Sequence, residues 1–456
     1  MNINDTFAYL NIGLPQDILR HKMYGNIDEA IRLIDLRLAD QDTPAPIRHC
    51  MTVQREMMAR TAGEFPFNRE EAMAELRSRI PDFTEQELDT LLDNNRINWA
   101  YINGEMHFFI RFVDTLIKTE PDLARRAGVK ETIKEGRSLL DECMAEMKEK
   151  GSKALRLRVR ATMRVRDEAF TPGMFMRAHL PIPIPCDQQS DIVIEKVYPE
   201  NGMIDPEDAL QRTVCWEETM QENHEFSVEY SYTHRSVWHD TTAQTSAAQQ
   251  PSFSTEEVEP HIVFTPYIRA LVEDLTRGVE DPLEKARRFY DFITKRMNYT
   301  FMPEYFTLEG IAENCARNGI GDCGVFALLF ITLCRCAGIP AQWQSGLCAR
   351  VGDTGAHDWA RFYVEPYGWL WADPSFGVSA NHAGNEERRQ FYFTSQDPYR
   401  MVANRAFQAG YVVEKKHWRR DPYDNQTGEM ETDERSLRAD EYERTQETLE
   451  CEELEA

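Results

Sequence analysis

The spacing of hydrophobic residues changes twice along the chain. In residues 1–150 the apolar positions recur at helical spacing, as in the stripe formed by Ile27, Ala30, Ile31, Ile34 and Leu38. This pattern predicts a mostly helical N-terminal module over 1–150.

Local signals place a helix start and a hairpin inside this module. Thr84 is followed three residues later by Glu87, which is the spacing of a capping box. Residues 96–109 read as a β-hairpin around Asn103-Gly104, a dipeptide that favours a type I′ turn. A helix followed by a hairpin also occurs in DNA-binding folds, but the acidic charge of the chain favours a packing role.

Residues 153–240 alternate between apolar and polar positions. The run from Leu155 to Val165 alternates apolar with mainly basic side chains, and the run from Glu225 to Tyr232 alternates again. Such alternation is typical of half-buried strands, so a small antiparallel β-domain is predicted here. Residues 241–255 are rich in Ser, Thr, Ala and Gln and indicate a linker.

The segment 256–411 mixes helices and strands and predicts a third domain. Helices are expected over 266–276 and 282–297, then an apolar helix from Cys323 to about Ala337, then a run of strands. The fold class is therefore α+β. Residues 412–456 are interpreted as an acidic C-terminal tail, either a solvated helix or disordered.

Composition limits the kinds of partner. The chain has 456 residues, 42% of them hydrophobic and 28% charged, which suits several packed domains. Its formal net charge is -25, and the stretch from residue 429 to 456 holds twelve acidic and three basic residues. This charge disfavours nucleic acid and anionic membrane surfaces as partners.

The cysteines and the apolar runs indicate a cytoplasmic protein. The first twenty residues show no basic stretch followed by an apolar core, so no secretory signal is expected. The longest apolar run, Val325 to Leu333, is far shorter than the roughly 20 residues of a membrane span. Ten cysteines without paired Cys-x-x-Cys units predict neither a disulfide framework nor a zinc site. No metal and no cofactor are expected.

Cys323 has the setting of a nucleophile. Asp322 is a favourable N-cap residue, so Cys323 would be the first residue of its helix, which Gly338 and Pro340 end. Unpaired backbone N–H groups and the positive end of the helix dipole lower the pKa of a thiol at this position. The same N–H groups can stabilise an oxyanion that forms beside the sulfur.

His357 and Asp373 are the predicted partners of Cys323. They lie on two strand-like runs separated by a turn, which would bring their side chains together. His357 would take the thiol proton, and Asp373 would hold the imidazole in the useful tautomer. Asp373 precedes Pro374, so it could instead be a turn residue. Asp358, next to the histidine, is expected to face away because strand residues alternate.

These residues resemble the transglutaminase-like superfamily, a group of papain-related thiol enzymes. The matching strings are Asp322-Cys-Gly-Val-Phe-Ala-Leu-Leu-Phe330, Leu333-Cys-Arg-Cys-Ala-Gly-Ile-Pro-Ala341 with Ser345-Gly346, His357 with Trp359, and Gly368-Trp369 with Asp373-Pro374-Ser375. The likeness covers about a quarter of the chain, and the β-domain also looks like a module that often precedes this core in bacterial members. The resemblance implies a Cys-bearing helix packed on an antiparallel sheet.

The resemblance also implies thiol acyl transfer on an amide, with Cys323, His357 and Asp373 as the catalytic residues. Tyr299 is the candidate for a second oxyanion donor, because an upstream hydroxyl or indole often serves that role in the family. Two positions depart from the family pattern. Gln342 stands where an arginine is common, and Asp358 replaces a small residue.

Three functions remain open on the sequence. The first is a cysteine protease or amidase acting through a thioester on a peptide or protein amide. The second is a protein-glutamine transglutaminase, in which a lysine amine replaces water; no acidic calcium loop follows the core, which favours hydrolysis. The third is an inactive core that serves as a binding protein, with residues 1–150 recognising a protein partner.

Overall fold

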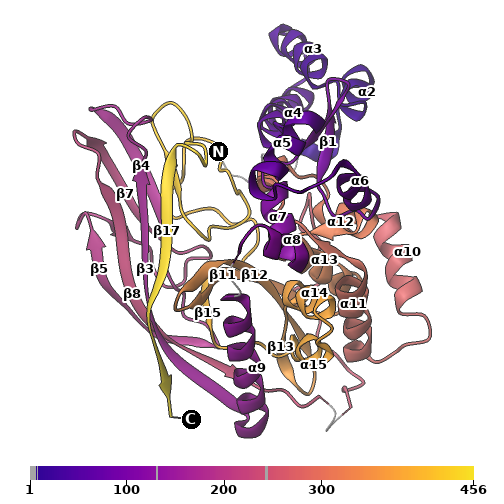
Figure 1. The fold of residues 1–456 in the computed structure, drawn as a ribbon, viewed down its shortest axis with the longest axis vertical. Helices are drawn as coiled ribbons and strands as arrows, with labels where there is room; N and C mark the ends of the chain where they lie inside the picture. The colour runs from indigo at the N-terminus through magenta and orange to yellow at the C-terminus, as the bar shows by residue number, and fades with distance from the viewer. Residues whose placement is uncertain (1–6, 8, 130–131, 242–244, 456) are drawn as a thin grey trace.

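The computed structural model describes residues 7, 9–129, 132–241 and 245–455, and the chain forms an α+β fold with several antiparallel sheets (Figure 1). The N-terminal region is helical, as predicted. Its elements are η1 (Tyr9–Ile12), α2 (Gln16–Met23), α3 (Ile27–Ala39), α4 (Ala45–Glu64), α5 (Arg69–Arg79), α6 (Glu85–Asp93), β1 (Trp99–Ile102), β2 (Glu105–Phe108), α7 (Phe112–Thr119), α8 (Pro121–Arg126) and α9 (Thr132–Lys150).

The local signals in this region are confirmed. Thr84 and Glu87 form a reciprocal capping box at the start of α6. Strands β1 and β2 pair antiparallel, with Ile102 opposite Glu105, and the turn between them has positive φ at both Asn103 (50°) and Gly104 (95°). A positive φ at both central residues is the requirement of a type I′ turn, so the sequence alone determines this hairpin.

Helix α9 does not belong to the N-terminal core, in contrast to the predicted boundary at residue 150. The apolar core of the first helices extends to Leu123. Four buried residues of α9 join the core of the remaining chain instead: Leu140, Cys143, Met144 and Met147. Arg388 also pairs with Asp141 of α9 at 2.6 Å. Helix α9 packs on β3, the strand that follows it, and on α15, which is distant in sequence.

The β-domain consists of two four-stranded sheets. Their strands from the predicted region are β3 (Ser152–Val165), β4 (Met174–Pro181), β5 (Gln189–Tyr198), β6 (Met203–Ile204), β7 (Thr213–Met220) and β8 (Glu225–Val237). The strand orders are β17-β3-β8-β5 and β16-β4-β7-β6, so a strand from the end of the chain completes each sheet.

The interpretation of residues 412–456 as a solvated helix or disordered tail is wrong. β16 (Glu429–Glu431) pairs with β4, and β17 (Tyr442–Leu454) pairs with β3 along nearly its whole length (Figure 1). The basic side chains of β3 explain why an acidic segment binds there: Arg158 contacts Glu450 at 3.0 Å. The acidic residues that resembled a solvated tail are the polar face of a strand.

Deleting residues 441–456 is expected to destabilise the protein strongly. Tyr442 is 2% exposed, and its burial alone contributes roughly 2–3 kcal/mol. The deletion also leaves β3 as a long unpaired edge, which favours aggregation. Thermal melting and size-exclusion chromatography should show a lower melting temperature and aggregates. Removing only residues 455 and 456, which lie beyond β17, serves as the control; equal melting of both truncations would contradict the prediction.

The third region carries a five-stranded antiparallel sheet of order β14-β13-β12-β11-β15. Its elements are α10 (Pro266–Leu275), α11 (Pro282–Arg296), β9 (Asn298–Tyr299), η2 (Tyr305–Thr307), α12 (Ile311–Asn318), β10 (Ile320–Gly321), α13 (Cys323–Cys336), β11 (Ala341–Arg350), β12 (Asp353–Val364), β13 (Gly368–Ala372), α14 (Pro374–His382), α15 (Glu386–Phe391), β14 (Phe393–Thr394) and β15 (Arg400–Asn404).

This sheet lies between helices and the β-domain. Helix α13 packs against β11 and β12, with Phe330 at 5.5 Å from Phe362 between ring centroids. On the other face, Ile184 from the segment after β4 joins Trp359, Trp371 and Val402 in a small apolar cluster. The predicted β-domain and the predicted third domain therefore pack directly on each other. The described part of the connection over 241–255 has no regular helix or strand.

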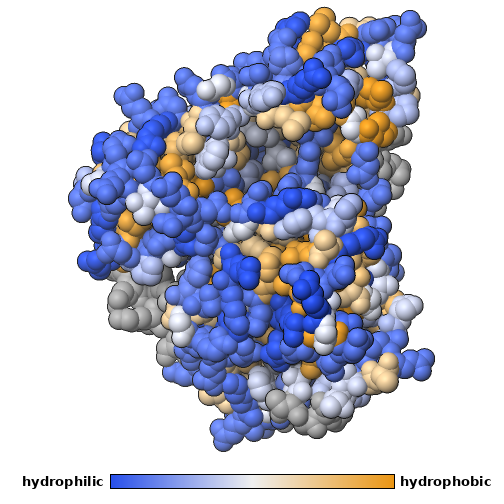
Figure 2. All heavy atoms as spheres, turned by 90° about the vertical axis from the view of Figure 1, so that its right-hand side faces the viewer, coloured by the Kyte–Doolittle hydropathy of each residue, from blue (hydrophilic) through white to orange (hydrophobic). Residues whose placement is uncertain are grey.

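The outer surface is mainly polar. Figure 2 shows polar side chains over most of the visible face, with apolar ones gathered in its upper part, where the N-terminal helices lie, and around its centre. Met23, Tyr24 and Tyr101 of this region are 76%, 75% and 53% exposed. Within the described residues, no helix is long and apolar enough to cross a membrane.

Candidate active site

Helix α13 positions Cys323 as the sequence predicts. The Asp322 side chain accepts a hydrogen bond from the backbone N–H of Val325 at 3.2 Å, so Asp322 is the N-cap and Cys323 the first helical residue. The helix ends at Cys336, and Gly338 follows with a φ of 77°. Residues 324–335 are buried, which fixes the helix and places its N-terminus against the sheet.

The surroundings of Cys323 oppose ionisation of its thiol, in contrast to the expected lowering of its pKa. Burial raises the pKa of Cys323 well above its usual value, and the carboxyl groups of Asp358 and Asp322 raise it further. Removal from water and two acidic neighbours therefore outweigh the helix N-terminus. The sequence analysis considered the helix dipole but not the tertiary neighbours.

His357 and Asp373 lie together, each on the element that the sequence indicates. His357 is on β12, and Asp373 follows β13 as the N-cap of α14. His357 Nε2 lies 2.7 Å from Asp373 Oδ2. Burial lowers the pKa of His357, while Asp373 opposes that shift. With Nε2–H donated to the carboxylate, Nδ1 is the ring nitrogen that can accept a proton.

Arg400 of β15 binds the aspartate of the histidine–aspartate pair. Its Nη1 donates to Asp373 Oδ2 at 2.8 Å, and its Nη2 donates to Asp397 at 2.7 Å. All three of these charged side chains are buried. Burial alone would raise the pKa of Asp373, but the charges of His357 and Arg400 lower it to about 2. Asp373 is therefore a carboxylate at neutral pH.

The hydrogen-bond partner of the thiol is Asp358, which the sequence analysis expected to face away. Cys323 Sγ donates to Asp358 Oδ2 at 3.2 Å, and no hydrogen bond joins Cys323 to His357 among the described residues. Successive strand residues alternate, so the two side chains leave β12 in different directions. A Cβ on Gly324 would lie 2.9 Å from Asp358 Oδ2, so this glycine makes room for the carboxyl.

Tyr299 and Lys118 lie beside the nucleophile. Tyr299 on β9 pairs with Gly321, two residues before Cys323, and its hydroxyl accepts a hydrogen bond from Lys118 Nζ at 3.0 Å. Burial raises the pKa of Tyr299, so the hydroxyl keeps its proton. Lys118 comes from α7 of the N-terminal helices. Its amine contacts the Tyr299 hydroxyl, and its charge acts on both Cys323 and His357.

Several residues of the site have no signal in the sequence. Lys118, Arg400 and Gln426 reach it from elements more than 20 residues away from Cys323, His357 or Asp373. Only Asp358 had a signal, the carboxyl directly after the histidine, and the direction of its side chain was predicted wrongly. Among the described residues, no group of three or more His, Cys, Asp or Glu is arranged to hold a metal ion.

One comparison with known proteins matches the region of the chain that contains the candidate site. Residues 269–374, which include Cys323, His357 and Asp373, match the model of the transglutaminase-like superfamily. The chain therefore contains a transglutaminase-like superfamily domain, formed by α10 to β13 and the residues between them. The match covers the candidate nucleophile but does not test the role of any residue.

Other likenesses are distant. The protein YebA of Bacillus subtilis (strain 168), described as uncharacterized, is 24% identical over 131 residues, which cover 25% of this chain and 18% of that protein. A solved structure from Cytophaga hutchinsonii, described as a "Putative Cysteine Protease", is 15% identical over 67% of this chain and 92% of its own, with a TM-score of 0.44. The periplasmic domain of TgpA from Pseudomonas aeruginosa is 16% identical over 54% of this chain and 95% of its own, with a TM-score of 0.27. Likenesses this distant carry no information about activity.

Proposed function

We propose that this protein is a cysteine-dependent hydrolase of the protease or amidase type, with Cys323 as its nucleophile. The observation that carries the proposal is the buried chain His357–Asp373–Arg400, held beside the helix that begins at Cys323. An imidazole on β12 that is oriented by a carboxylate, and a thiol at the N-terminus of α13, the helix that packs on β12, are the groups that nucleophilic acyl transfer uses.

The proposed reaction begins with a proton transfer. His357 Nδ1 takes the thiol proton while Sγ attacks the amide carbonyl carbon, and the carbonyl electron pair moves to oxygen. The backbone N–H of Cys323 and the hydroxyl of Tyr299 would stabilise this oxyanion. The C–N bond then breaks, His357 protonates the leaving amine, and a thioester remains. Water activated by His357 releases the acid and restores the thiol.

Site-resolved alkylation tests the pairing of Cys323 with His357. Because the pKa of Cys323 is raised, its reaction with iodoacetamide should accelerate as the pH rises above neutral. In His357→Ala the rate at Cys323 should fall about 10-fold or more at pH 8, since a base contributes at least that much. Mass spectrometry reads all ten cysteines, with Cys336 at the other end of α13 as the internal reference.

The control for this experiment is His224→Ala, which changes a histidine of the β-domain. It should leave the alkylation of Cys323 unchanged. If His357→Ala, shown to be folded by its melting temperature, reacts at the wild-type rate, then His357 is not the base. In that case the hydrolase proposal loses its supporting observation.

Amine transfer differs only in the second half of the reaction. The runner-up is a protein-glutamine transglutaminase, in which a lysine amine attacks the thioester in place of water. Incorporation of a labelled primary amine into a glutamine-containing protein, absent in Cys323→Ala, would favour this alternative over hydrolysis.

A binding role on an inactive core is the third candidate, and one observation favours it. The thiol is hydrogen-bonded to Asp358 and makes no hydrogen bond to His357 in the described structure. If Cys323 labels no faster than Cys336 at any pH, this alternative is preferred. The exposed apolar side chains of the N-terminal helices would then be the first surface to test for a protein partner.

The compartment and the kind of substrate remain part of the proposal. All ten cysteines are free thiols, which fits the cytoplasm that we propose. The proposed substrate is a peptide or protein amide, with neither nucleic acid nor membrane as a partner, because the net charge of -25 repels polyanions.

A further inference from the structure

Helix α7 of the N-terminal region lies against the stretch of chain that runs beside the start of α13. Tyr299 pairs with Gly321, and the backbone N–H of Thr300 donates to the Gly321 carbonyl oxygen at 2.9 Å. The next backbone N–H, that of Phe301, donates to Thr115 Oγ1 of α7 at 3.1 Å. Phe301 also packs against the apolar core of the N-terminal helices. These contacts fix α7 beside the segment that leads directly into the helix of the candidate nucleophile.

Lys118 lies on the face of α7 that contacts this segment. Arg111, Thr115 and Lys118 follow one another at spacings of four and three residues, so they share one side of the helix. Lys118 Nζ lies 4.2 Å from the ring centre of Tyr299 and 4.7 Å from that of Phe301. It also donates to the Tyr299 hydroxyl at 3.0 Å. Two aromatic rings thus hold the ammonium group through cation–π contacts.

The ammonium group of Lys118 has donors to spare. The side chain is exposed, and among the residues that the structure describes it forms no ion pair with a carboxylate. Its hydrogen bond goes to the neutral Tyr299 hydroxyl, and an ammonium group carries three N–H donors, so two of them are available to a ligand. The charge of Lys118 acts on both Cys323 and His357, so this ligand would lie beside the reacting groups.

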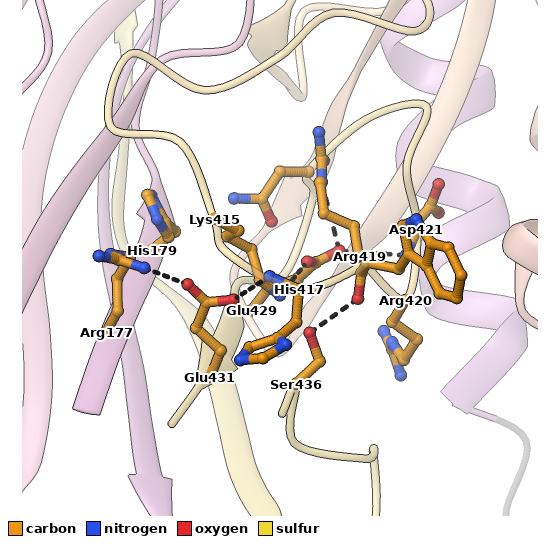
Figure 3. Close-up of polar contacts among 12 residues, drawn as sticks. Arg177, His179, Lys415, His417, Arg419, Arg420, Asp421, Glu429, Glu431 and Ser436 are labelled. Atoms are coloured by element: carbon orange, nitrogen blue, oxygen red, sulfur yellow. Dashed lines mark hydrogen bonds and ion pairs between the residues drawn. The ribbon is translucent and has the colours of Figure 1, made fainter. Parts of the chain in front are cut away.

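The other cations around the site are already paired. Arg400 binds two buried carboxylates. On another side of the site lies the segment 415–436, whose Gln426 donates to Asp358, and its cations also point towards carboxylates (Figure 3). The pairs are Lys415 with Glu429, Arg419 with Glu429, and Arg177 of β4 with Glu431. Of these cations, Lys118 alone has no carboxylate partner in the described part of the chain.

We propose that Lys118 is a specificity-determining residue whose ammonium group binds a carboxylate of the substrate, so that the cleaved amide lies close to a negative charge of the same peptide. This inference rests on the proposed hydrolysis by Cys323. The carboxylate belongs either to an Asp or Glu side chain or to the C-terminus of the peptide, since both present the same group. The carboxyl groups of Asp322 and Asp358 would repel it from the other surroundings of the sulfur, which favours a single orientation.

The proposal gives the N-terminal helices a role in the reaction. The three candidate catalytic residues lie in the third region of the chain, whereas Lys118 comes from α7. The net charge of -25 repels an anionic substrate from most of the surface, so a local cation is needed to hold a carboxylate at the site.

Two alkylating reagents of nearly equal size separate charge recognition from thiol reactivity. Iodoacetate carries a carboxylate where iodoacetamide carries a neutral amide. In Lys118→Met the ratio of the iodoacetate rate to the iodoacetamide rate at Cys323 should fall about 5-fold at low salt, because a nearby unit charge contributes at least this much. Any effect of Lys118 on ionisation of the thiol cancels in this ratio. Added salt should lower the wild-type ratio, and Cys336 serves as the internal reference.

Peptide hydrolysis then identifies the source of the carboxylate. In a peptide library read by mass spectrometry, a side-chain carboxylate gives Asp or Glu at a fixed distance from the cleaved bond. A terminal carboxylate gives cleavage at a fixed distance from the C-terminus. Converting this group to its amide should raise the wild-type KM about 10-fold at unchanged kcat, because a charge-assisted hydrogen bond is lost. Lys118→Met should cleave the acid and the amide with equal KM, and Lys118→Glu should prefer the amide.

Lys416→Met is the matched control. It removes the same charge from a lysine that is 55% exposed and pairs with Asp433 at 2.8 Å, so it should keep both the reagent ratio and the preference for the acid. All variants are made in the full chain, and their melting temperatures are measured. Lys118→Gln replaces Lys118→Met as the neutral variant if the latter does not fold.

A reagent ratio that stays at the wild-type value in a folded neutral variant of Lys118 would overturn the inference. So would an equal loss of hydrolysis on the acid and the amide peptide, because Lys118 would then act on the reaction and not on the charge of the substrate. These outcomes differ from failure of the proposed function. If no peptide is cleaved while the ratio falls in Lys118→Met, hydrolysis is rejected and carboxylate binding beside Cys323 stands.

Discussion

Replacing Cys323 with alanine is expected to lower amide hydrolysis by about 10⁴-fold or more, because no other group can form the thioester. Tyr299, Lys118 and the backbone N–H groups remain in Cys323→Ala, so substrate binding should change little. The loss should therefore appear in kcat and leave KM nearly unchanged. A peptide library read by mass spectrometry supplies the substrate: the first peptide that the wild-type protein cleaves is used for the kinetic comparison.

The matched control is Cys336→Ala at the opposite end of the same helix. Cys336 is half-buried and takes no part in the site, so this variant should retain wild-type turnover. Equal loss in both variants would show that packing of α13, and not the thiol, is responsible. Hydrolysis that survives in Cys323→Ala would exclude the thioester route.

Replacing Arg400 with methionine is expected to destabilise the protein by about 3–5 kcal/mol. Arg400 is fully buried and pairs with both Asp373 and Asp397. The substitution keeps an unbranched apolar side chain but leaves two buried carboxylates without their cation, which is the costly way to break a buried ion pair. Denaturant unfolding at pH 7 should show the lower stability, and hydrolysis should fall because Asp373 no longer holds His357 firmly.

The effect should depend on pH in a defined direction. The pKa of Asp373 is lowered to about 2 in the folded protein, and the pKa of Asp397 is also lowered. A lowered folded pKa stabilises the protein above the unfolded value, about 3.9, and this contribution is lost as the pH falls towards 2. The difference between wild type and Arg400→Met should therefore shrink as the pH falls from about 4 towards 2.

Arg277→Met is the surface control for this experiment. Arg277 follows α10, is 78% exposed and, among the described residues, forms an ion pair with Asp274 alone, so its loss should cost at most about 1 kcal/mol. If Arg400→Met is no more destabilising than Arg277→Met, the buried network contributes nothing to the fold. A difference that stays constant at low pH would show that packing, and not charge, is the cause.

Local signals predicted the elements that carry the chemistry. The cap at Asp322, the apolar helix from Cys323 and the turn at Asn103-Gly104 all depend on contacts within a few residues. The same holds for the two strands that bring His357 to Asp373, because one short turn joins them. Caps, turns and periodicity act over such distances, so the sequence is sufficient for these features.

The acidic end of the chain shows where this reasoning fails. Its residues form β17 only because the basic strand β3, some 290 residues earlier, offers a complementary partner. A charge run without its partner looks like a solvated tail. The boundary at residue 150 missed a contact of the same kind, since α9 packs on the following strand β3 and also on α15, which lies far along the chain.

The sequence by itself determined the class of fold, the position of Cys323 at a helix start and the pairing of His357 with Asp373. Only the tertiary structure decided that Asp358 contacts the thiol, that Arg400 anchors Asp373, and that Lys118 and Gln426 reach the site from opposite ends of the chain. The physical reason is that burial and charge act through space. The pKa of Cys323 depends on which groups the whole fold places around it, and helix position alone predicted the wrong direction.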